Sequence, residues 1–264
     1  MKKVKIMGVL NLAPDSFYDG HRDILLNKQK LASRLAFLKD SDIIDVGCES
    51  SRPGSKPISE KEEIERLSTL INSTNKDSFF SIDTYKYKVA KYALENGFKM
   101  INDIYAGRFD DNKMLELASD FKVPIVLMHM KGDPVNMQRD TSYDSVIDNI
   151  CSFFDERISV AKDYGIVDKN IILDPGIGFG KSIDDNFSIV KNIDKFKRIG
   201  YKVLIGLSRK SFLSYKGDTP EDRLSATIAM NTLSVLNGAD IIRVHDPSES
   251  IKMKDVLIKY SFCN

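Results

Sequence analysis

The 264-residue chain has only three cysteines and three histidines, and its net charge at pH 7 is +1. Cys48, Cys151 and Cys263 are odd in number and lack the spacing of metal ligands. This disfavours a disulfide framework and a zinc site, and it fits a reducing, cytoplasmic compartment. Because no cluster of basic residues accompanies the low net charge, we expect no general attraction to nucleic acid or to anionic membranes.

Long apolar segments, linkers and low-complexity tracts are also missing. The apolar stretch after Lys2 and Lys3 is too short for a signal peptide or a membrane span, and Asn11 and Asp15 follow it directly, so it is expected to form a first strand. The composition, with 42% hydrophobic and 29% charged residues, is ordinary for a globular protein. We expect residues 1–264 to form a single domain.

Eight apolar runs of strand length recur at regular intervals along the chain. They lie near residues 4–10, 42–46, 79–82, 99–102, 124–128, 170–173, 202–206 and 241–244. Segments with helical spacing of apolar residues separate them, as in Ile64, Leu67, Leu70 and Ile71. Continuous apolar strands indicate a parallel sheet covered by helices. The repetition predicts an α/β fold, a single (β/α)8 TIM barrel with its active site at the C-terminal ends of the strands.

Three of these apolar runs end on a carboxylate or an amide, namely Asp83, Asn102 and Asp174. Buried polar groups of this kind need partners. Together they offer hydrogen-bond acceptors and an amide that can both donate and accept, which suits a flat ring edged with amino and N–H donors. The alternative is that they brace neighbouring loops. The long segments at residues 11–22, 47–57 and 129–142 are expected to cover the same face.

Other strand ends and loops carry groups suited to an anion and a metal ion. Asn11 ends the first run and offers a hard oxygen ligand for Mg²⁺, although an Asn there could simply cap a turn. Arg52 could grip phosphate with its planar fork, or be an ordinary surface Arg. Lys210, Arg243 and His245 belong to the segments that end the seventh and eighth runs, where barrels of this type often bind phosphate.

These segments resemble those of the dihydropteroate synthase family, whose members are pterin-binding barrels. The resemblance covers nearly the whole chain. It rests on Ile6–Asn11, Asp83–Lys86, Ile101–Ile104, Leu127–Met130, Asp174–Lys181, Ser208–Phe212 and Arg243–Asp246. It implies a reaction of folate biosynthesis, in which 6-hydroxymethyl-7,8-dihydropterin diphosphate and p-aminobenzoate give 7,8-dihydropteroate and diphosphate by an SN1-like substitution.

The resemblance also implies roles for individual residues. The pterin ring would contact Asp83, Asn102, Asp174, Lys210 and Arg243. The diphosphate would contact Asn11, Ser51, Arg52, Arg243 and His245, with Asn11 as the ligand of Mg²⁺. The p-aminobenzoate site, which sulfonamide inhibitors also occupy, would comprise Ser51, Arg52, Pro53, Phe179, Lys210 and Ser211. Arg52, Lys210, Arg243 and His245 would act in catalysis, and the protein would be a homodimer.

The sequence departs from the family pattern at Ala13, Cys48 and Ser51, where Thr, Gly and Thr are usual. Ser51 keeps the hydroxyl group, whereas Cys48 restricts backbone freedom that Gly would allow. Two other functions stay open. One is a methyltetrahydrofolate-dependent corrinoid methyltransferase, which has a similar fold but does not need the diphosphate residues. The other is a catalytically silent pterin-binding paralogue.

Overall fold

The computed structural model describes residues 4–13, 27–50, 55, 57–74 and 78–262. Eight parallel strands pair in sequence order, and the last pairs with the first, so the sheet closes into a barrel. The strands are β1 (Lys5–Asn11), β2 (Ile43–Gly47), β3 (Phe80–Asp83), β4 (Met100–Asp103), β5 (Ile125–Met128), β6 (Ile171–Asp174), β7 (Lys202–Ile205) and β8 (Ile241–Val244). The predicted (β/α)8 barrel is confirmed, with each expected strand within one residue of its observed bounds.

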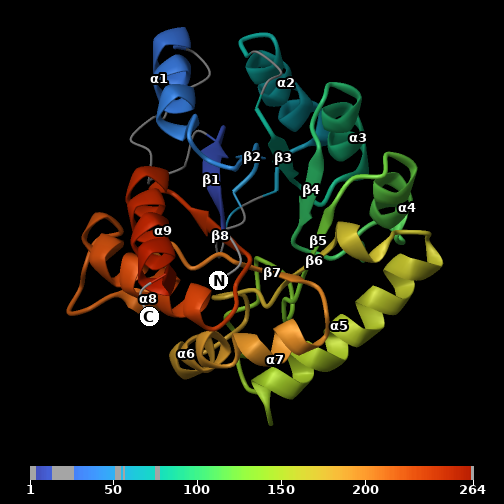
Figure 1. Ribbon diagram of the computed structural model, residues 1–264. Helices are drawn as coiled ribbons and strands as arrows, with labels where there is room; N and C mark the ends of the chain where they lie inside the picture. Colours follow the sequence, from blue (N-terminus) through green and yellow to red (C-terminus); the bar gives the residue numbers. More distant parts are fainter. Residues whose placement is uncertain (1–3, 14–26, 51–54, 56, 75–77, 263–264) are drawn as a thin grey trace.

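Helices surround the barrel (Figure 1). They are α1 (Lys28–Leu38), α2 (Glu60–Ile71), α3 (Tyr87–Glu95), α4 (Lys113–Asp120), α5 (Val146–Asp163), α6 (Ile183–Lys191), α7 (Ile193–Arg198), α8 (Leu224–Leu236) and α9 (Pro247–Phe262). Short 3-10 turns occur at η1 (Asp168–Asn170), η2 (Ser211–Leu213) and η3 (Glu221–Arg223). Helix α9 packs against α1 and β1, so the helical layer closes as the sheet does.

The helix ends follow from local sequence. Ser182 caps α6 by accepting from the N–H of Asp185, whose side chain accepts from the N–H of Ser182 in return. Glycines 97, 165, 200 and 238 lie just after helical segments and have positive φ angles, which side chains on other residues disfavour. These four positions were predicted as helix ends. The return to the next strand is therefore short, and the longer loops are left to the opposite end of the barrel.

Two apolar layers hold the barrel together. A large cluster lies between the strands and the helices, and includes fully buried Phe154 and Phe196. A second, smaller cluster draws one residue from most strands: Met7, Ile43, Met100, Val126, Ile172, Leu204 and Ile241. Because side chains alternate between the two faces of a strand, this second cluster fills the barrel interior. The polar residues described next lie above it.

Within the described ranges, no helix is long and apolar enough to cross a membrane.

Candidate functional site

Three predicted site residues lie at the C-terminal end of the barrel, on β3, β4 and β6. Asp83 ends β3, Asn102 is the partner of Asp83 in the β3–β4 register, and Asp174 ends β6. Asn102 and Asp174 are buried, and Asp83 is half-buried. Strand register therefore brings the expected ring-binding groups to one face of the barrel.

Arg243 of β8 crosses the barrel mouth and connects two carboxylates. Its Nε donates to Asp45 Oδ2 at 2.7 Å, and its Nη2 donates to Asp83 Oδ2 at 2.6 Å. Asn102 Nδ2 donates to the same Asp45 oxygen at 2.9 Å. Burial and the nearby carboxylate of Asp45 raise the pKa of Asp83 to about 7, against the opposing effect of Arg243. One oxygen of Asp83 is thus already engaged before any ligand arrives.

Asp174 keeps one oxygen free of backbone contacts. Its Oδ1 accepts from the N–H of Gly176 at 2.7 Å, which fixes the start of the β6–α6 loop. Burial raises the pKa of Asp174, and the positive charges of Lys210, Lys181 and Arg243 oppose that rise. A carboxylate surrounded by three cations stays available as an acceptor.

Lys210 lies between Asp174 and an aromatic ring. Its Nζ is 4.6 Å from the centre of the Phe179 ring and donates to the carbonyl oxygen of Ile177. Burial lowers the pKa of Lys210 to about 8, although Asp174 raises it. The ammonium group therefore joins the β6–α6 loop to the β7–α8 loop, and it presents a positive charge beside the buried carboxylate.

A second lysine braces the β6–α6 loop from outside the mouth. Lys181 Nζ donates to the carbonyl oxygens of Phe179 and His129 at 3.0 and 3.3 Å, and it lies 3.0 Å from His129 Nδ1. Burial lowers the pKa of Lys181 to about 7. Gly176 has φ +68°, and a Cβ there would lie 1.9 Å from the His129 carbonyl oxygen. Only glycine fits where this loop crosses the end of β5.

His245 and Ser211 lie at the edge of the site. The N–H of His245 donates to Ser208 Oγ at 3.2 Å, and its ring Nδ1 lies 3.1 Å from that hydroxyl. Ser211 is exposed and begins η2. Between them, Arg209 forms two 2.6 Å hydrogen bonds to the Asp246 carboxylate, which fasten the loops after β7 and β8 to each other. The sequence placed Arg209 in this region but did not reveal its partner.

Asn11, the predicted metal ligand, faces Asp83 across a glycine. A Cβ on Gly47 would lie 3.5 Å from Asn11 Oδ1 and 3.5 Å from Asp83 Oδ2. The two oxygens therefore border one space at the ends of β1 to β3. Among the described residues, no group of three or more His, Cys, Asp or Glu side chains could hold a metal ion.

Three predicted residues, Ser51, Arg52 and Pro53, lie outside the described residues. Cys48 in the same loop is described and fully buried, and its backbone is not in the left-handed region. A side chain in place of the usual glycine therefore causes no backbone strain at that position. The carbonyl oxygen of Cys48 accepts from Arg66 Nη1 at 2.6 Å. Cys48 and Cys151 are both free thiols.

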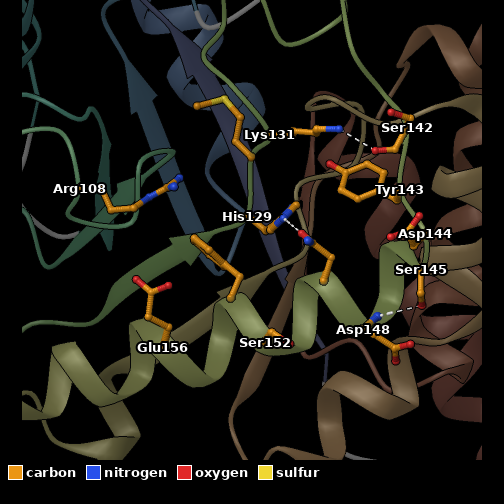
Figure 2. Close-up of a pocket in the computed structure, with 13 residues that line it drawn as sticks. Arg108, His129, Lys131, Ser142, Tyr143, Asp144, Ser145, Asp148, Ser152 and Glu156 are labelled. Carbon is orange, nitrogen blue, oxygen red and sulfur yellow. Dashed lines mark hydrogen bonds between the residues drawn. The ribbon is translucent and has the colours of Figure 1, made fainter.

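A cleft of about 920 Å³ lies along α5 and the loop between β5 and α5. Figure 2 shows His129 in its wall and the polar residues Ser145, Asp148 and Glu156 of the α5 region around it. The His129 ring Nε2 lies 3.0 Å from Asn149 Oδ1, and burial lowers the pKa of His129 to about 3. None of the predicted site residues lines this cleft. Arg108, Met130 and Lys131, which follow β4 and β5, also line the cleft, and Lys181 contacts His129 in its wall.

Asp45, which contacts Arg243 and Asn102, was not assigned to the site from the sequence. The sequence shows the carboxylate of Asp45 inside the apolar run of β2. The available signal was that a charge within a continuous buried strand needs a buried partner. The identity of that partner, Arg243, is set only by closure of the barrel.

Comparison with known proteins agrees with this geometry. Residues 7–245 match the family model described as pterin binding enzyme. The chain is 39% identical to the dihydropteroate synthase of Clostridium beijerinckii, over 98% of this chain and 96% of that protein. It is 32% identical to the Yersinia pestis dihydropteroate synthase solved with a sulfonamide drug, with a TM-score of 0.90 over 98% of this chain and 94% of that one. It is also 32% identical to the Xanthomonas albilineans enzyme solved with 4-aminobenzoic acid, with a TM-score of 0.90 over 100% and 95% of the two chains. The chain therefore belongs to the dihydropteroate synthase family of pterin-binding enzymes.

Proposed function

We propose that the barrel mouth condenses 6-hydroxymethyl-7,8-dihydropterin diphosphate with p-aminobenzoate, in the dihydropteroate synthase reaction of folate biosynthesis. The observation that carries this proposal is the grouping of Asp83, Asn102, Asp174, Lys210 and Arg243 at the strand ends. Such a grouping would offer hydrogen-bond acceptors to a ring and positive charges to a leaving anion. Membership of the family supports the same reaction.

Ring recognition would depend on acceptors that the protein leaves open. Asn102 uses its NH2 group on Asp45, which leaves its carbonyl oxygen to accept from the ring. Asp174 uses only Oδ1 on the Gly176 N–H. A pterin edge carries amino and N–H donors, so these two acceptors would fix the orientation of the ring. A ligand lacking those donors would leave buried acceptors without partners, at a cost in affinity.

The leaving group would be stabilised by positive charge. Lys210 follows β7, Arg243 lies in β8 and His245 follows β8. The resemblance adds Ser51 and Arg52, which lie outside the described residues. As the bond to diphosphate breaks, negative charge grows on the departing oxygen, and fixed cations favour that state. Positive charge left on the exocyclic carbon would spread into the electron-rich ring. An uncharged aryl amine is then a sufficient nucleophile, and no covalent enzyme intermediate is required.

The donor set fits an Mg²⁺ ion bound mainly through the substrate. Mg²⁺ commonly takes one or two protein oxygens and completes its shell with water and phosphate oxygens. Asn11 Oδ1 supplies a hard oxygen, and Asp83 Oδ2 borders the same space. Bound there, the ion would neutralise charge on the diphosphate. Asn11 would hold it, and the protein cations would supply the remaining positive charge.

The p-aminobenzoate site would lie over Phe179 and Lys210, with Ser211 at its edge. The ammonium group beside the ring can pair with the carboxylate of the substrate, and the aromatic face can pack against the benzene ring. Sulfonamides would compete there. The cytoplasmic location, the homodimer, the single-domain organisation and the roles of Ser51, Arg52 and Pro53 stay predictions.

Incubation of the protein with both substrates and Mg²⁺, followed by chromatographic detection of dihydropteroate and diphosphate, tests the proposal. Product formation in strict dependence on both substrates is expected. A silent paralogue would bind the pterin substrate and release no diphosphate. A corrinoid methyltransferase would instead move a methyl group from methyltetrahydrofolate to a cobalamin acceptor, so the same protein should be assayed with those reagents in parallel.

A further inference from the structure

Asp45 lies inside the barrel, below the residues of the mouth. Its side chain is completely buried. Alternation along β2 puts Asp45 on the same side as Ile43, which belongs to the apolar cluster of the barrel interior, and as Gly47, which borders Asn11 and Asp83. The Asp45 carboxylate therefore lies between two layers of inward-facing residues: the apolar layer of Ile43 below it and the layer of Gly47, next to the site, above it.

The contacts of Asp45 are to residues of the site itself. A single oxygen, Oδ2, accepts from Arg243 Nε at 2.7 Å and from Asn102 Nδ2 at 2.9 Å. The other oxygen, Oδ1, is buried and has no hydrogen-bond partner among the described residues. Asp45 thus joins β2 to β4 and β8 from beneath, whereas Asp83 holds Arg243 from the side.

Stability alone does not explain a carboxylate at this position. Burying an ion pair is costly, and apolar side chains of similar size often replace such pairs without loss of stability. An open buried acceptor adds to the cost. The interior layer directly beneath Asp45 is apolar, so a leucine or isoleucine would be an ordinary choice here. Its register partner on β1, Val9, is apolar too, whereas its partner on β3, Ser81, is polar.

We propose that Asp45 is a positioning residue, which orients Asn102 and Arg243 for the pterin ring. The inference rests on the proposed function. Drawing Asn102 Nδ2 downward turns the carbonyl oxygen of that amide toward the mouth, where a ring donor can reach it. Holding Arg243 by Nε and Nη2 fixes the plane of the guanidinium and leaves Nη1 for a ligand. Asp45 itself does not touch the substrate.

Two substitutions separate positioning from a structural role. Asp45→Leu leaves Arg243 Nε and Asn102 Nδ2 without their acceptor, so the midpoint of thermal unfolding should fall. The leucine fills the space and Arg243 keeps its bond to Asp83, so the protein should still fold, and the assays are made below the lowered midpoint. Its kcat/KM for pterin diphosphate should fall about 10 to 100-fold, because misplaced binding groups cost rate at this scale. The KM for p-aminobenzoate should change less than about 2-fold, since Phe179 and Ser211 have no contact with Asp45. Asp45→Asn can accept both hydrogen bonds with its one oxygen and should recover most of the lost kcat/KM.

Asp42→Leu is the matched control. Asp42 precedes the same strand at the opposite end of the barrel, where it accepts from Lys254 at 2.8 Å and from the N–H of Ile6 at 2.9 Å. Its loss should lower stability and leave kcat/KM unchanged. Normal kcat/KM for Asp45→Leu would overturn the inference and leave the proposed function intact. An Asp45→Leu protein that does not fold would also overturn it, because the carboxylate would then serve the fold. A wild-type protein that makes no dihydropteroate would refute the proposed function, and this inference with it.

Discussion

Asp174→Asn tests the ring-binding role at a buried strand-end carboxylate. The substituted amide can still accept from the Gly176 N–H through its oxygen, so the 2.7 Å contact that shapes the β6–α6 loop survives. What changes is the other atom, which turns from an acceptor into an NH2 donor. That donor would face the amino and N–H groups of the pterin ring and the ammonium of Lys210.

The size of the effect follows from this one exchange. A buried donor without a partner costs about 1 to 3 kcal/mol, which corresponds to a loss of roughly 5 to 150-fold in pterin affinity. The free energy of unfolding should change little, because burial disfavours the ionised Asp174 and the Asn is neutral. Loss of the carboxylate should also lower the pKa of Lys210 further below its value of about 8, since Asp174 raises it.

Calorimetric titration with the pterin diphosphate measures the affinity directly. Asp103→Asn is the control, because Asp103 is an equally buried strand-end carboxylate whose two oxygens both accept from backbone, from the N–H groups of Tyr105 and Gly107 at 2.8 and 2.6 Å. It should lose stability and keep its pterin affinity. Equal affinity of wild-type and Asp174→Asn protein would refute the assignment of Asp174 to the ring.

Three further outcomes are expected. Arg243→Ala should lower the rate of synthesis about 10² to 10³-fold, a loss of about 2.7 to 4 kcal/mol of transition-state stabilisation. His245→Ala should lower the rate less. Near-normal turnover in a folded Arg243→Ala protein would remove Arg243 from the mechanism. Burial lowers the pKa of Lys181 to about 7 in the folded protein, from an ordinary value of 10.5. Between these pH values the unfolded chain binds more protons than the folded protein, so the free energy of unfolding should rise with pH, by at most about 1.4 kcal/mol per pH unit. Urea unfolding at pH 7.5 and 9 should show this slope, and the same slope in a Lys181→Met variant would contradict the assignment to Lys181. p-Aminobenzoate should bind well only after pterin and diphosphate with Mg²⁺, because Ser51 and Arg52 are expected to serve both the diphosphate and p-aminobenzoate. Tight binding of p-aminobenzoate to the free protein, measured by titration, would exclude that order.

The strands and the barrel were predictable because they depend on local pattern. Eight continuous apolar runs, each followed by a helical segment, fix the type and number of elements, and parallel strands with helical crossovers close in one hand. The carboxylates Asp83 and Asp174 were recognisable for the same reason, since each stands at the end of an apolar run. Glycines 97, 165, 200 and 238 ended helical segments as expected.

The partners of these groups were not predictable from local pattern. Arg243 and Asp45 are 198 residues apart in sequence, yet Arg243 Nε lies 2.7 Å from Asp45 Oδ2 in the barrel. Arg209 contacts Asp246 only because the loops after β7 and β8 lie side by side. The sequence determined that charged residues would lie at the buried strand ends, because Asp83 and Asp174 directly follow apolar runs. Barrel closure and strand register decided which charges meet, because the contacts of a buried charge depend on through-space distance between strands and not on separation along the chain.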